Sequence, residues 1–138
     1  MIYLDTSAIL KLLRREPESD ALADHLAAHP EQDLITSTLA TVETARALTA
    51  LGDGDTAARA VRRSDRIEIG DGVILALTIS AGVLDLARAL PPAVLRSSDA
   101  IHLATVKLAG PGIDHLVTYD KRMIAAAEAA GLRIASPT

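Results

Sequence analysis

Short apolar runs alternate with helical segments along nearly the whole chain of 138 residues, and this alternation most constrains its fold. Strands are expected over residues 2–5, 34–36, 73–77, 115–118 and 132–135. Helices are expected over 7–15, 19–28, 38–51, 56–63, 80–90, 99–109 and 121–130, several of them ended by Pro or Gly. Because apolar strands separated by helices form parallel sheets that helices cover on both faces, the predicted fold class is α/β.

The composition predicts one domain over residues 1–138, because the chain shows no internal repeat, low-complexity tract or linker. Hydrophobic residues make up 49% of it, much of this alanine and leucine, which favours tight helix packing. No apolar run approaches the roughly 18 residues of a membrane span, and the N-terminus lacks the pattern of a signal peptide. We therefore expect a cytoplasmic protein with no membrane partner.

Several kinds of chemistry are excluded or disfavoured by composition. The absence of cysteine excludes disulfides, thiolate zinc sites and thiol nucleophiles. Tyr3 and Tyr119 are the only aromatic residues, which argues against the stacking platforms of many single-strand binders. The net charge of −4 is unusual for a nucleic-acid binder. That objection weakens if some of the 18 acids hold metal ions.

Four acidic residues stand where a carboxylate contributes little to a core: Asp5, Glu43, Asp99 and Asp120. Asp5 and Asp120 follow apolar strands, and the carboxyl ends of parallel strands share one edge of a sheet. Asp99 opens a predicted helix. If the fold brings the four together, no internal cation evident in the sequence balances them. Such a cluster is typical of a site for Mg²⁺ or Mn²⁺ that acts on phosphate esters.

A structural interpretation competes for each acid. Asp5, Asp99 and Asp120 each precede a predicted helix, where Asp is a preferred N-cap. On a helical wheel Glu43 lies on a mostly apolar side, while threonines take much of the other side. Arg46, one turn on, is a possible ion-pair partner for Glu43.

Polar residues near the acids are candidates for supporting roles. Thr6 and Thr118 are placed to orient carboxylates or hold metal-bound waters, with helix capping as the alternative. His102 is expected to be hydrogen-bonded rather than to act as a base or ligand. The other three histidines lack metal-like spacing and are expected at the surface: His25, His29 and His115. The basic run over 59–66 is expected to be a solvated helix face.

Four segments together resemble the PIN-domain ribonucleases, and most closely the VapC toxins of toxin–antitoxin pairs. They are MIYLDTSAILKLL, the E-x-x-R-A-L that begins at Glu43, LRSSDAIHLATVKL and LVTYDKRMIAAAEAAGLRI. The resemblance implies an α/β/α sandwich with a mainly parallel sheet and a metal-dependent endoribonuclease. By position, Asp5, Glu43, Asp99 and Asp120 match the family's four catalytic, metal-binding acids, and Thr6 and Thr118 match its accompanying hydroxyls.

The resemblance also implies partners. These are an RNA substrate, a VapB-like antitoxin that covers the active cleft, and a second copy of the chain in a homodimer or a toxin–antitoxin hetero-oligomer. Basic residues that follow Asp5 and Glu43 are then candidates for RNA contact: Lys11, Arg14, Arg15 and Arg46. Mg²⁺ or Mn²⁺ is the expected cofactor, activating a water that attacks the phosphodiester.

Two other hypotheses remain open. A phosphohydrolase or phosphotransfer domain would use Asp5 as its nucleophile, although the D-x-D-x-T signature is not met because position 7 is serine. A catalytically silent binding module would use the four acids only as helix caps and ion-pair partners, and would bind no divalent metal.

Overall fold

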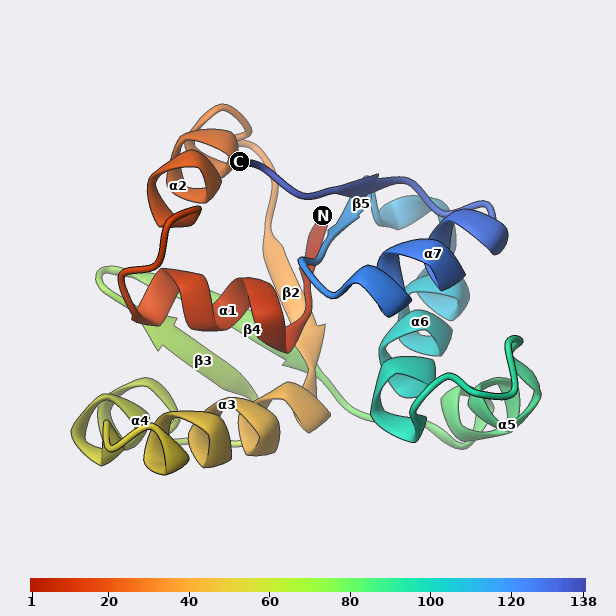
Figure 1. The fold of residues 1–138 in the computed structure, drawn as a ribbon, viewed down its shortest axis with the longest axis horizontal. Helices are drawn as coiled ribbons and strands as arrows, with labels where there is room; N and C mark the ends of the chain where they lie inside the picture. The colour runs from red at the N-terminus through yellow and green to blue at the C-terminus, as the bar shows by residue number, and fades with distance from the viewer.

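A mainly parallel sheet forms the centre of the computed structural model, which describes residues 1–138 (Figure 1). The strands are β1 (Ile2–Leu4), β2 (Leu34–Ser37), β3 (Arg66–Ile69), β4 (Gly72–Leu77), β5 (His115–Val117) and β6 (Ile134–Ala135). Their order is β3-β4-β2-β1-β5-β6, and only β3 is antiparallel to its neighbour. The predicted α/β class and mainly parallel sheet are confirmed.

Helices cover both faces of the sheet. Four belong to one layer: α1 (Thr6–Leu13), α2 (Ser19–Ala27), α3 (Thr38–Ala50) and α4 (Gly54–Ala60). The other layer contains α5 (Ala81–Ala89), α6 (Ser97–Ala109) and α7 (Lys121–Ala129), with a short 3₁₀ turn at Gly110–Gly112. Figure 1 shows α1, α3 and α4 on one side of the strands and α5, α6 and α7 on the other. No helix has the length and apolar character needed to cross a membrane.

The central strand β1 explains why there are two cores. Its residues are all fully buried, and successive side chains of a strand point to opposite faces. Ile2 and Leu4 therefore pack into the core beneath α1 and α2, whereas Tyr3 packs into the core beneath α6 and α7. The continuous run Ile2–Leu4, with no polar residue alternating in it, is the sequence pattern of a strand that is buried on both faces.

The strand β3 was not predicted, and the basic run over 59–66 does not form the helix face that was expected. The expected helix over 56–63 ends at Ala60, and Arg66–Ile69 forms the edge strand β3. A two-residue turn joins β3 to β4, with Gly70 in the left-handed region at φ 54°. Arg62 and Arg63 lie in the loop before this hairpin and pair with Glu68 and Asp65. The run is therefore no continuous helix face.

The prediction that His25, His29 and His115 lie at the surface was wrong for His115, and the structure brings the three rings together. His115 at the start of β5 is 8% exposed, and its Nε2 lies 2.8 Å from Nε2 of His25 on α2. His29 packs against both rings, with centroids 4.8 Å from His25 and 5.7 Å from His115. His115 lies 90 positions after His25, so their proximity comes from the tertiary fold.

This cluster predicts a loss of stability in mild acid. Burial, together with the nearby His115 and His29, holds the pKa of His25 below its ordinary value. The unfolded chain then binds a proton at His25 more readily than the folded chain, so the free energy of unfolding falls as pH drops through about 6.5. Urea unfolding at pH 7.5, 6.5 and 5.5 measures this. His25→Gln is expected to flatten the trend, and an unchanged slope in that variant contradicts the assignment.

Candidate functional site

The end of β1 places Asp5 at the sheet edge where the parallel strands terminate. Its carboxylate is 2% exposed and caps α1 by accepting a hydrogen bond from the backbone N–H of Ala8 at 3.0 Å. Ser7 Oγ donates to Oδ1 at 2.6 Å, and Thr118 Oγ1, just beyond β5, donates to Oδ2 at 2.6 Å. Burial raises the pKa of Asp5, and these hydrogen bonds partly oppose that rise.

Asp99 and Asp120 are joined by one arginine that the sequence interpretation missed. Arg96 donates from Nε to Asp99 Oδ2 at 3.2 Å and from Nη2 to Asp120 Oδ2 at 3.0 Å. The cluster therefore does contain an internal cation. The signal was present in the sequence, since an arginine three residues before an aspartate at a helix start can pair with it.

The capping interpretation is correct for Asp120 and wrong for Asp99. Asp120 Oδ1 accepts from the backbone N–H groups of Arg122 and Met123 at the start of α7. α6, however, begins at Ser97, which places Asp99 inside the first turn, 5% exposed and without a capping bond. Its observed side-chain partner is Arg96, so this buried carboxylate has no structural role as a cap.

Glu43 reaches the same region from α3. Thr6 Oγ1 and His102 Nε2 both hydrogen-bond to its Oε1, at 2.8 and 2.7 Å, while Oε2 has no protein partner. The Glu43 side chain remains 28% exposed. Burial raises its pKa, but the bonds from His102 and Thr6 outweigh this and hold the pKa of Glu43 below its ordinary value.

The predicted orientation of α3 was partly wrong. Thr41 and Thr44 are buried with Ala40 and Leu48, so the threonines face inward rather than outward. Glu43 lies at the margin of this buried face. Arg46 is exposed and forms no ion pair with Glu43.

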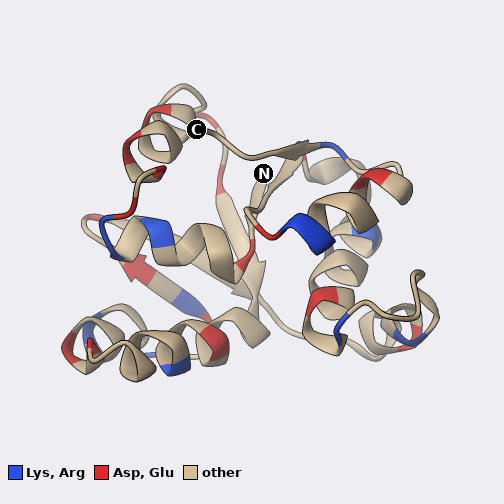
Figure 2. Cartoon of the chain, in the orientation of Figure 1, with Lys and Arg blue, Asp and Glu red and all other residues tan.

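Hydrogen bonds link three of the acidic residues at this edge of the sheet: Thr118 joins Asp5 to the backbone N–H of Asp120, and Arg96 joins Asp120 to Asp99. Glu43 is bonded separately, to Thr6, the residue that follows Asp5. Figure 2 shows acidic positions on α3 and at the starts of α6 and α7, around the end of β1. Oxygen donors of this kind suit a hard divalent cation. In the arrangement observed, no three His, Asp or Glu side chains converge to hold an ion. The donor chemistry fits such a metal, while Arg96 and neighbouring hydroxyls occupy many of the oxygens.

The predicted substrate-contact residues differ in their availability. Lys11 is paired with Glu16 and Glu18, both at 2.7 Å, and lies 4.8 Å above the ring of Tyr119. Exposed Arg15 pairs with Asp20. Arg14 and Arg46 form no ion pair; Arg46 lies one turn after Glu43 on α3, and Arg14 follows the end of α1 opposite Asp5.

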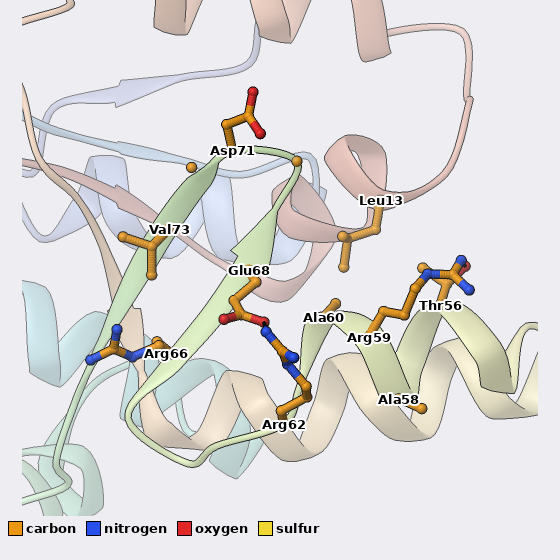
Figure 3. A pocket seen from close by; sticks show the side chains of 12 residues that line it. Leu13, Thr56, Ala58, Arg59, Ala60, Arg62, Arg66, Glu68, Asp71 and Val73 are labelled. Carbon is orange, nitrogen blue, oxygen red and sulfur yellow. Dashed lines mark hydrogen bonds and ion pairs between the residues drawn. The ribbon is translucent and has the colours of Figure 1, made fainter.

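One pocket has no lining residue among the four acids. A hollow of about 680 Å³ opens between α4 and the β3–β4 hairpin (Figure 3). Arg59, Arg62 and Arg66 line it, and Figure 3 shows Arg62 beside Glu68, to which it donates at 2.8 Å. The pocket is therefore basic at its rim, but part of that charge is already neutralised.

Comparison with known proteins agrees with the fold. The profile of the PIN domain matches residues 2–129. Ribonuclease VapC35 of Mycobacterium tuberculosis is 48% identical over 141 residues, covering 99% of this chain and 97% of the relative.

Solved structures show the same fold at lower identity. The M. tuberculosis toxin VapC20, described as cleaving the sarcin–ricin loop, aligns with a TM-score of 0.71 at 20% identity, covering 91% of this chain and 95% of that one. A toxin–antitoxin complex from Klebsiella pneumoniae aligns with a TM-score of 0.65 at 17% identity, covering 100% and 98%. The chain therefore belongs to the PIN-domain family and is a relative of its VapC ribonucleases.

Proposed function

We propose that this protein is a metal-dependent endoribonuclease and the toxin of a toxin–antitoxin pair, with Asp5, Glu43, Asp99 and Asp120 as its catalytic acids. The observation that supports the proposal is that Thr118 and Arg96 link Asp5, Asp120 and Asp99 at one sheet edge, with Asp5 and Asp99 buried, and that Glu43 is bonded to Thr6 beside Asp5. Burying carboxylates this close together is costly, and function is the usual reason for accepting that cost.

Each residue has a definable task in this proposal. A divalent cation, Mg²⁺ or Mn²⁺, held by the four acids would lower the pKa of a bound water and stabilise charge on the phosphate. Thr118 and Ser7 fix both oxygens of Asp5, and Thr6 fixes Glu43. Arg96 bridges Oδ2 of Asp99 and Oδ2 of Asp120, so a cation that takes these two oxygens would displace its guanidinium.

No protein nucleophile is required. The chain has no cysteine, and the hydroxyl of Ser7 donates to Asp5 while accepting from the backbone N–H of Tyr119. Position 7 is serine, so the D-x-D-x-T signature of enzymes that use an aspartate nucleophile is not met, which weighs against the phosphotransfer hypothesis.

The proposed partners are RNA, a VapB-like antitoxin and a second copy of the chain. The K. pneumoniae toxin–antitoxin complex and the VapC relatives support an antitoxin. Large exposed apolar side chains support a protein interface, among them Val42, Leu51, Val94 and Leu108. Arg14 and Arg46 are the better candidates for RNA contact, with Lys11 and Arg15 already paired.

Incubation of purified protein with RNA tests the activity. We expect cleavage with Mg²⁺ or Mn²⁺, loss of cleavage with EDTA, and a loss of about a hundredfold or more in Asp99→Asn. Sequencing the new RNA ends defines the site. Equal cleavage by Asp99→Asn, or cleavage unaffected by EDTA, contradicts the proposal.

The same samples separate the alternatives. A silent binding module predicts neither cleavage nor calorimetric heat on addition of Mn²⁺. A phosphotransfer enzyme predicts an acyl-phosphate on Asp5 that mass spectrometry detects after acid quench.

A further inference from the structure

A buried hydrogen-bonded chain leads from the second core to Glu43. The phenol oxygen of Tyr3 lies 2.7 Å from Nδ1 of His102, and Nε2 of His102 lies 2.7 Å from Oε1 of Glu43. Tyr3 is fully buried and His102 is 1% exposed, so water does not compete for the bond between them. The two rings meet edge to face, with centroids 5.8 Å apart.

Donor and acceptor rules fix the direction of this chain. A carboxylate can only accept, so the bond to Glu43 requires a proton on Nε2. The phenol of Tyr3 carries its own proton at neutral pH and donates it to Nδ1. In its neutral form His102 is therefore the Nε2–H tautomer, with each ring nitrogen used once.

The consequence falls on the two oxygens of Glu43. His102 and Thr6 both donate to Oε1, from α6 and α1, and the side chain cannot rotate without losing both bonds. Oε2 is left without a protein partner on a partly exposed group. The two hydrogen bonds hold Oε1 in place, a contact called the clamp below, and leave Oε2 free to bind a ligand.

We infer that His102, oriented by Tyr3, is a positioning residue that fixes Glu43 so that Oε2 is available as a metal ligand. This inference rests on the proposed function, because it assigns the clamp to the same metal site. His102 does not itself touch substrate or metal in this assignment. Partners that orient metal ligands typically change metal affinity about 10- to 100-fold when they are removed.

A matched pair of variants tests the inference. The Gln side-chain amide approximates Nε2 of histidine, whereas that of Asn approximates Nδ1. His102→Gln keeps a donor toward Glu43, and we expect its Mn²⁺ affinity within about threefold of the wild type; His102→Asn loses that donor, and we expect about 10- to 100-fold weaker binding. Calorimetric titration of the full chain with Mn²⁺ measures both. Thr44→Val on α3 is the control, since the Thr44 hydroxyl has no hydrogen-bond partner.

The outcomes distinguish a failure of the inference about His102 from a failure of the proposed metal site. Equal Mn²⁺ affinity of the Gln and Asn variants overturns the inference while leaving the proposed function intact. Absence of Mn²⁺ binding in the wild type overturns both. If His102→Asn does not fold, Tyr3→Phe replaces it: we expect at least about threefold weaker Mn²⁺ binding, and wild-type affinity in that variant overturns the inference.

Discussion

Asp5→Asn is expected to lower RNA cleavage by about a hundredfold or more while the protein stays folded. Asn is nearly isosteric and is itself a good N-cap, so its side-chain oxygen can still accept from the backbone N–H of Ala8. The variant removes the negative charge that would bind the cation. One of the two hydroxyl donors to Asp5, Ser7 or Thr118, then faces an amide NH₂ instead of an oxygen.

Two further variants isolate the charge. Asp5→Ala removes the cap as well, and we expect about 1 kcal/mol or more of additional destabilisation relative to Asp5→Asn. Asp24→Asn makes the same chemical change at an exposed position of α2 and should leave cleavage unchanged. Initial cleavage rates at saturating Mg²⁺, with circular dichroism to verify folding, give the comparison. Cleavage by Asp5→Asn within a few-fold of the wild type excludes Asp5 from catalysis.

Much of the fold was predictable because it depends on local patterns. Ile2–Leu4 and His115–Val117 are short runs that the sheet buries completely, and positive-φ Gly52 and Gly131 follow α3 and α7. The strand β3 was missed because Arg66–Ile69 alternates polar and apolar residues and follows a basic run. The turn at Gly70–Asp71, leading into an apolar strand, was the available hairpin signal.

The candidate site was predictable to the extent that acids follow strands or start helices. The positions of Asp5 and Asp120 follow from the common edge of parallel strands. The links between acids were not predictable, because they join distant segments: Arg96 reaches Asp120 across 24 positions and His102 reaches Glu43 across 59. Side-chain pairing over such separations depends on how α3, α6 and α7 pack, which local pattern does not specify.

Leu116→Ala is expected to destabilise the protein by about 2–5 kcal/mol, the largest effect on stability that we predict. Leu116 is fully buried at the centre of β5 and packs in the core with Tyr3, Leu103 and Met123. Truncation removes buried apolar surface, and the backbone of a central strand cannot move to fill the space. The expected fall in melting temperature is on the order of 10 °C.

Leu51→Ala is the matched control, because Leu51 at the end of α3 is 58% exposed and its truncation leaves no cavity. We expect a change within about 0.5 kcal/mol for this variant. Urea unfolding of both variants and the wild type, analysed with a common slope, gives the difference directly. A loss below about 1 kcal/mol for Leu116→Ala means that the second core can collapse around the missing side chain. Tyr3 belongs to the same core as Leu116, so a core that collapses in this way would hold Tyr3, and through it His102 and Glu43, less rigidly.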